Sequence, residues 1–97
     1  MIRGFANQGT EDIFNGRDTK AARATCPPLL WNGAAKRLEM LDSADSLNDL
    51  RVPPGNRLEK LKGNREGQHS TRINDRYRIC FEWSESGPLE VEIVDYH

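Results

Sequence analysis

Residues 68–93 read QHSTRINDRYRICFEWSESGPLEVEI, and apolar side chains recur there at every second position. A period of two is typical of a β-strand with one buried face. Residues 74–75 (ND) and 85–88 (ESGP) interrupt the alternation with amino acids that favour tight turns. The stretch therefore predicts three consecutive antiparallel strands, whose inward residues are His69, Thr71 and Ile73, then Tyr77, Ile79, Phe81 and Trp83, then Leu89, Val91 and Ile93.

A different pattern precedes these strands, because apolar residues between positions 28 and 50 recur at spacings of three and four. Such spacing is typical of an amphipathic helix, and a proline pair is well placed to begin one. The predicted helix follows Pro27-Pro28 and presents Leu30, Ala34, Leu38 and Leu41, and a short second turn carries Leu47 and Leu50. Together the patterns predict an α+β domain in which helices cover the apolar face of the sheet and the polar face stays open.

The first 26 residues give a weaker pattern. Residues 2–5 predict a short opening strand, and residues 8–14 predict a helical turn. Residues 15–26 lack a periodic apolar face, so we interpret them as a loop.

Length and composition limit the classes of protein to consider. The chain has 97 residues, of which 36 % are apolar, and a net charge of −1. We expect one domain over residues 1–97, and in the absence of a long apolar run or a signal peptide we expect it in the cytoplasm. Cys26 and Cys80 are too few for a disulfide scaffold, and with His69 and His97 they show no ligand spacing, so we expect no metal and no cofactor.

Charge is distributed unevenly along the chain. Residues 57–78 carry seven Lys or Arg against three Asp or Glu, whereas residues 79–97 carry five acidic residues and no Lys or Arg. A basic segment of this kind is either a solvated face or a surface for a polyanion, and binding to a polyanion would be sensitive to salt.

The candidate chemistry lies in this basic segment and in the terminal Asp95-Tyr96-His97. An imidazole titrates near neutrality and can move protons, and a carboxylate can orient it. Guanidinium groups can hold a phosphate and the charge that develops on it. These are the parts of a metal-free ribonuclease, although a histidine near a chain end is also commonly just solvated.

Three segments resemble one known family. They read PPGNRLEKLKGNREGQHS (53–70), INDRYRICF (73–81) and VEIVDYH (91–97). Through them the chain is similar to HigB-type toxins, the plasmid-maintenance killer proteins of the RelE/ParE superfamily. The resemblance implies a RelE-like α+β fold, with an N-terminal strand and helices on one face of a small, mainly antiparallel sheet. It also implies a toxin that cuts messenger RNA at the ribosome without a metal and is neutralised by a helix-turn-helix HigA-type antitoxin, through which alone it would meet operator DNA.

The resemblance further implies roles for individual residues. Asp95, Tyr96 and His97 match the C-terminal catalytic cluster of the family, in which His97 or Asp95 would activate a ribose 2′-hydroxyl. Lys62 matches a basic residue beside the active site, and Arg78 matches a strand arginine near the scissile phosphate. The remaining candidates for contacts with RNA phosphates in the basic segment are Arg57, Arg65 and Arg76.

Position 59 departs from the family pattern. Some relatives place a catalytic histidine where this chain has Glu59, so either Glu59 is the base or the C-terminal cluster acts without it. Two other functional classes stay open: a non-catalytic module that binds the antitoxin and tunes operon repression, and a ParE-like inhibitor of DNA gyrase. The terminal Asp95-Tyr96-His97 counts against both, because neither has an evident use for it.

Overall fold

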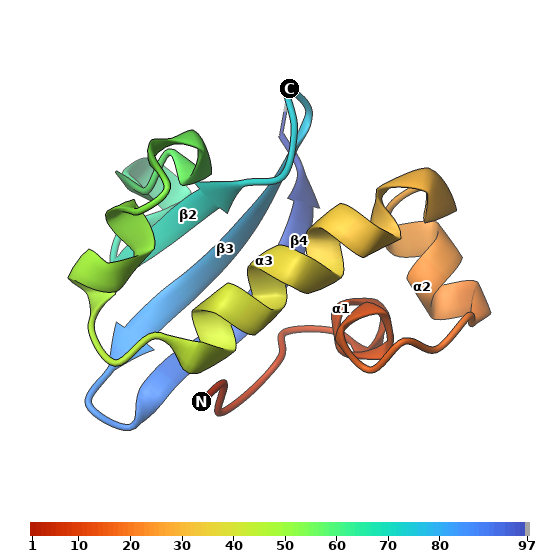
Figure 1. Cartoon of the computed structure of the whole chain (residues 1–97), viewed down its shortest axis with the longest axis horizontal. Helices are drawn as coiled ribbons and strands as arrows, with labels where there is room; N and C mark the ends of the chain where they lie inside the picture. The colour runs from red at the N-terminus through yellow and green to blue at the C-terminus, as the bar shows by residue number, and fades with distance from the viewer. Residues whose placement is uncertain (97) are drawn as a thin grey trace.

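The alternating stretch folds as the sequence predicts. In the computed structural model, which describes residues 1–96, four strands form one antiparallel sheet in the order β1-β2-β3-β4 (Figure 1). They are β1 (Glu59–Lys60), β2 (Gln68–Arg72), β3 (Tyr77–Ser84) and β4 (Gly87–Asp95). Thr71 lies opposite Ile79, which lies opposite Ile93, so one row of side chains crosses three strands. The three predicted strands are confirmed.

The core lies between this sheet and α3 (Trp31–Ser43), which crosses one face of the sheet (Figure 1). Ile79, Phe81 and Val91 of the sheet are fully buried. The predicted helix is confirmed, because its inward residues Ala34, Leu38 and Leu41 join the same core. Two 3₁₀ turns flank it, η1 (Pro28–Leu30) before it and η2 (Leu47–Arg51) after it, and η2 is the predicted second turn.

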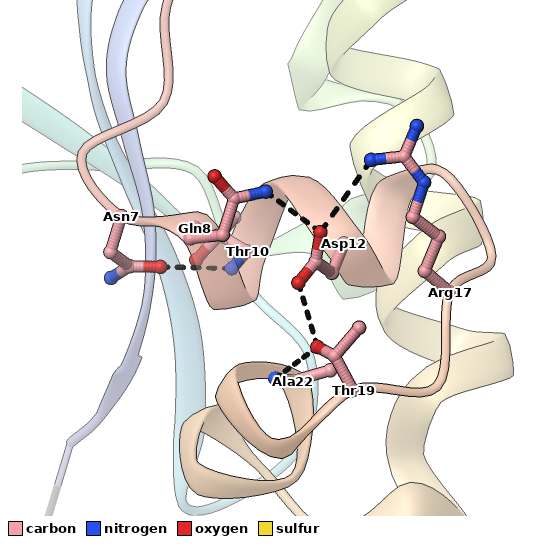
Figure 2. Close-up of polar contacts among 7 residues, drawn as sticks. All are labelled: Asn7, Gln8, Thr10, Asp12, Arg17, Thr19 and Ala22. Carbon is pink, nitrogen blue, oxygen red and sulfur yellow. Dashed lines mark hydrogen bonds and ion pairs between the residues drawn. The ribbon is translucent and has the colours of Figure 1, made fainter.

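The prediction of a loop over residues 15–26 is wrong, because this segment contains a second helix. The predicted turn at α1 (Gln8–Phe14) is confirmed, and α2 (Lys20–Thr25) follows it. Thr19 caps α2 by accepting a hydrogen bond from the Ala22 amide and donates one to Asp12, 2.7 Å away (Figure 2). Ala22 is the only buried residue of α2, so a helix this short shows no apolar periodicity.

Asp12 joins the two helices through its carboxylate (Figure 2). It accepts hydrogen bonds from Thr19 and Gln8 and lies 3.8 Å from a guanidinium nitrogen of Arg17. The hydrogen bond from Thr19, then that from Gln8, lowers the pKa of Asp12, so the carboxylate stays ionised as an acceptor near neutral pH.

The predicted N-terminal strand is wrong in extent. Residues 2–5 run beside β4, but only Phe5 forms a bridge, a parallel one to Val91. The β3–β4 register shifts between Cys80 and Glu82, and Glu90 on β4 has a φ of 52°. Backbone hydrogen bonds from Arg3 to Pro88, from Val91 to Gly4 and from Ala6 to Val91 nevertheless hold the N-terminal segment along β4.

The prediction of an open polar face is also wrong in part. The segment from η3 (Pro54–Asn56) to η4 (Gly63–Arg65) contacts the face of the sheet that α3 does not cover, because the Arg57 carbonyl accepts a hydrogen bond from Arg78. Ser70 and Cys80, which pair across β2 and β3 on this face, are consequently buried. Within residues 1–96, no helix is long and apolar enough to cross a membrane.

Candidate active site

A cleft of about 400 Å³ opens at one end of the partly covered face of the sheet. The end of β2, the start of β3 and the residue after β4 meet there, together with the segment that leads into β1. Its lining is strongly polar and consists of Arg57, Glu59, Arg72, Asn74, Asp75, Arg78 and Tyr96.

Arg78 is the most constrained side chain of the cleft. Only 9 % of the surface of Arg78 is exposed, which is unusual for an arginine. Its Nε donates to Ser70 Oγ at 2.7 Å, and its Nη2 donates to the Arg57 carbonyl at 2.6 Å. Glu59 Oε2 lies 3.9 Å from the same Nη2. The guanidinium is therefore held in one orientation by oxygen atoms from three segments, as preorganised electrostatic stabilisation requires.

Arg72 lies directly opposite Arg78 across the β2–β3 pair, and both line the cleft. Two like charges in register destabilise a sheet unless other groups compensate them. Here Asp75 compensates the charge of Arg72. Glu59, Ser70 Oγ and the Arg57 carbonyl compensate the charge of Arg78. The fold thus brings two arginines that pair across neighbouring strands to the lining of one cleft, and this suits an anion such as phosphate.

The C-terminal tail reaches the cleft through Tyr96. The Cζ atom of Arg78 lies 6.0 Å from the centroid of the Tyr96 ring, at the limit of a cation–π contact. Asp95 accepts two hydrogen bonds from Arg76, each 2.7 Å long. His97, the third member of the predicted catalytic cluster, lies outside the described residues.

Four predicted residues, Asp95, Lys62, Arg65 and Arg76, are not part of the cleft lining. Lys62 is exposed just after β1, and Arg65 donates to Glu92 at 3.1 Å and to Gln68 at 3.0 Å, on the same sheet face. The hydrogen bond from Arg76 to Asp95, and then the charge of Asp95, raises the pKa of Arg76. Of the predicted residues, the cleft brings together Arg57, Glu59, Arg78 and Tyr96. It leaves four outside the lining: Lys62, Arg65, Arg76 and Asp95.

The cleft also contains residues that sequence reasoning missed, namely Arg72, Asn74 and Asp75. The position of Arg72 follows from the strand register, in which position 72 pairs with position 78, whereas a two-residue turn at 74–75 would pair it with position 77. Asn74 shapes that turn, since its Oδ1 accepts hydrogen bonds from the amides of Arg76 and Tyr77.

Groups that could bind metal are few in the part of the chain that the structure describes. No cluster of three or more His, Cys, Asp or Glu side chains converges among residues 1–96. Cys26 and Cys80 are free, buried thiols, and burial raises the pKa of both.

The fold is shared with a chain of a solved complex. A chain of the YoeB-YefM complex from Staphylococcus aureus superposes with a TM-score of 0.61 at 16 % identity, over 100 % of this chain and 98 % of that one. At this identity the match shows a common RelE-like α+β architecture and no more.

Sequence comparison gives the family. Residues 3–97 match the family described as the RelE-like toxin of type II toxin-antitoxin system HigB. The chain is 47 % identical over 83 residues to Toxin HigB-1 of Vibrio cholerae, covering 86 % of this chain and 84 % of that protein. It is also 27 % identical over 97 residues to Endoribonuclease HigB of Proteus vulgaris, over the full length of both. The chain belongs to the HigB-like toxin family, as its motifs predicted, and a toxin of this class is paired with an antitoxin.

Proposed function

We propose that this HigB-family toxin is a metal-independent endoribonuclease that cuts messenger RNA in the cytoplasm, on the ribosome. The name of the Proteus vulgaris relative, which matches over its full length, supports ribonuclease activity. We further propose that the paired antitoxin is of the helix-turn-helix HigA type and that the toxin meets operator DNA only through it.

The observation that carries the proposal is the fixed guanidinium of Arg78 at the cleft. Two of its nitrogens are bound to Ser70 and Arg57. Arg72, which pairs with Arg78 across β2 and β3, also lines the cleft. A phosphate in this cleft would meet two cationic groups, one of which cannot reorient. That arrangement stabilises the extra negative charge of a pentavalent phosphoryl transition state more than the charge of the ground state.

The proposed reaction uses the ribose 2′-hydroxyl as the nucleophile. Its oxygen bonds to the adjacent phosphorus while the bond to the 5′-oxygen breaks, which gives a 2′,3′-cyclic phosphate and a 5′-hydroxyl. One group must remove the 2′ proton, and another must protonate the departing 5′-oxygen. Glu59 is a candidate base because its half-exposed carboxylate lines the cleft. His97 is the candidate for the second proton-transfer group, since both oxygens of Asp95 are bound by Arg76.

The remaining basic residues have lesser roles in this proposal. Arg57 and Arg72 bind the neighbouring phosphates from the cleft lining. Lys62 and Arg65 contact the message beyond the cleft. Tyr96 stacks on a base, for which an aromatic ring 43 % exposed at the mouth of the cleft is suited.

Dependence on the ribosome follows from how little acid–base chemistry the cleft contains. His69 faces the helix side of the sheet, where its ring stacks on Phe81 at a centroid distance of 6.2 Å, so it cannot serve the cleft. Holding the message with the 2′-oxygen in line with the leaving group can lower the activation free energy by roughly 7–11 kcal/mol in favourable cases. The ribosome would provide that placement.

The test is to express the chain without its antitoxin and to map RNA 5′ ends in translating cells. We expect new 5′ ends inside translated codons, which disappear when translation initiation is blocked. Growth arrest with relaxed or damaged DNA and unchanged messenger 5′ ends would instead identify a gyrase inhibitor. Normal growth with unchanged RNA and DNA would instead identify a non-catalytic module that binds the antitoxin.

A further inference from the structure

Arg76 lies outside the cleft lining and forms three contacts with the C-terminal tail. Its Nε and Nη2 donate to the two oxygens of the Asp95 carboxylate, each at 2.7 Å. Its main-chain carbonyl accepts a hydrogen bond of 2.5 Å from the amide of Tyr96. Side chain and backbone of one residue therefore hold two consecutive residues of the tail.

The Arg76 guanidinium is itself held in place. Its Cζ lies 5.7 Å from the centroid of the neighbouring Tyr77 ring, and Tyr77 pairs with Asp95 across β3 and β4. Asn74 fixes the backbone of the turn through its hydrogen bonds to the amides of Arg76 and Tyr77. The turn between β2 and β3 is thus joined by hydrogen bonds to Asp95 and Tyr96.

We infer that Arg76 is a positioning residue that fixes the C-terminal tail against the cleft, and that it does not contact the RNA. The inference rests on the proposed ribonuclease function. Arg76 gives two nitrogens to both oxygens of Asp95, whereas the ion pairs of Arg65 and Arg72 each use one nitrogen. An RNA phosphate would therefore have to displace a two-point carboxylate contact to bind Arg76. Tyr96, the next residue of the tail, lines the cleft, so a shift of Asp95 would move Tyr96 relative to Arg78.

The geometry requires arginine at this position. A bidentate contact to both oxygens of a carboxylate needs the planar fork of a guanidinium, which the single ammonium of lysine cannot reproduce. The hydrogen bond to Asp95, followed by the charge of Asp95, raises the pKa of Arg76. Because both side chains are substantially exposed, at 58 % for Arg76 and 35 % for Asp95, the pair has little importance for overall stability, and its loss should leave the domain folded.

The experiment compares the parent toxin with Arg76→Lys, Arg76→Gln and a control, Arg23→Gln. Arg23 forms an exposed ion pair with Asp18 on the α2 side of the molecule, so the control removes the same charge from a pair remote from the cleft. Single-turnover cleavage is measured on ribosomes that carry a defined message, at increasing toxin concentration and at two salt concentrations. Amide hydrogen exchange of Tyr96 is followed by NMR on the free toxins.

Positioning predicts that both Arg76 variants lose about 100-fold in the rate at saturating toxin, since misplacement by about 1 Å has this effect. The half-saturating concentration should stay within about threefold, and Tyr96 amide exchange should accelerate in both variants while the control matches the parent. An RNA contact predicts the opposite: Arg76→Lys would retain the rate, and Arg76→Gln would raise the half-saturating concentration and lower its salt dependence. That result, or unchanged rate and exchange in both variants, overturns the inference. A parent toxin that cuts no message overturns the proposed function itself, and is recognised without any variant.

Discussion

Replacement of Arg78 separates the structural role of this residue from its proposed chemistry. Arg78 donates to Ser70 Oγ and to the Arg57 carbonyl from a nearly buried position. Arg78→Ala removes both donors and leaves those acceptors with one partner fewer. Arg78→Lys keeps a positive charge but cannot donate along both directions of the guanidinium plane.

The expected magnitudes follow from these contacts. A hydrogen bond from a charged group contributes about 1.5–3 kcal/mol, so we expect Arg78→Lys to lose about 2 kcal/mol of unfolding free energy and Arg78→Ala about 3–4 kcal/mol. For a domain of this size each kcal/mol lowers Tm by about 4–8 °C. Loss of a positioned donor at the reacting phosphate lowers the rate by about 10²–10³. Lys62→Ala, at an exposed position outside the cleft lining, should lower it by less than about tenfold.

The assay is single-turnover cleavage on programmed ribosomes at 20 °C, with thermal unfolding of each toxin recorded separately. Rates are compared only where the melting curve shows a folded variant, so a loss of activity is not a loss of fold. The reasoning is refuted if folded Arg78→Ala cuts within a few-fold of the parent. It is refuted equally if Lys62→Ala loses more activity than Arg78→Ala.

Two further predictions concern the fold. The Cβ of Gly9→Ala would clash with Thr25 Oγ1 and lie 2.5 Å from the Ala21 carbonyl oxygen, so this change should lower the unfolding free energy by about 1–3 kcal/mol in urea titrations. Gly55→Ala, with nothing within 4 Å of its Cβ, should have little effect, and equal effects of the two changes would exclude close packing of α1 on α2. Burial, with the charges of Lys60 and Arg51, lowers the pKa of His69 below its usual 6.5. As the pH falls, the unfolded state therefore binds the proton before the folded state does, and the free energy of unfolding should decrease from pH 6.5 toward pH 5. The lowered pKa values of Asp12 and Asp49 affect stability only at more acidic pH, so His69→Phe should remove most of the pH dependence of stability between pH 6.5 and 5. A parent protein whose stability is constant from pH 7 to 5 would contradict the prediction.

Sheet and core were predictable because their signal is periodic. Alternation over residues 68–93 determines which side chains face α3, and the spacing of Leu38 and Leu41 determines which face of α3 meets them. The helix α2 carries no such signal, because its stability comes from the cap at Thr19 and one buried alanine. The periodicity of apolar residues cannot predict a short helix that is stabilised mainly by its cap and by one buried residue.

The candidate site was predictable where the motif and the strand agree, as at Arg78. Arg72 was missed because its place depends on the register between β2 and β3, which a motif does not encode. Arg76 was predicted as an RNA contact from its charge alone, yet the structure pairs that charge with Asp95, nineteen residues further along the chain. A count of basic residues therefore overstates the number that are free to bind phosphate.

The most direct test of the ribonuclease proposal is to incubate the purified toxin with one message, either free or held on ribosomes, and to determine the ends of the products. The account predicts cleavage within codons on the ribosome only, with a 2′,3′-cyclic phosphate on one product and a 5′-hydroxyl on the other. Efficient cleavage of the free message, or products that carry a 3′-hydroxyl and a 5′-phosphate, would contradict it.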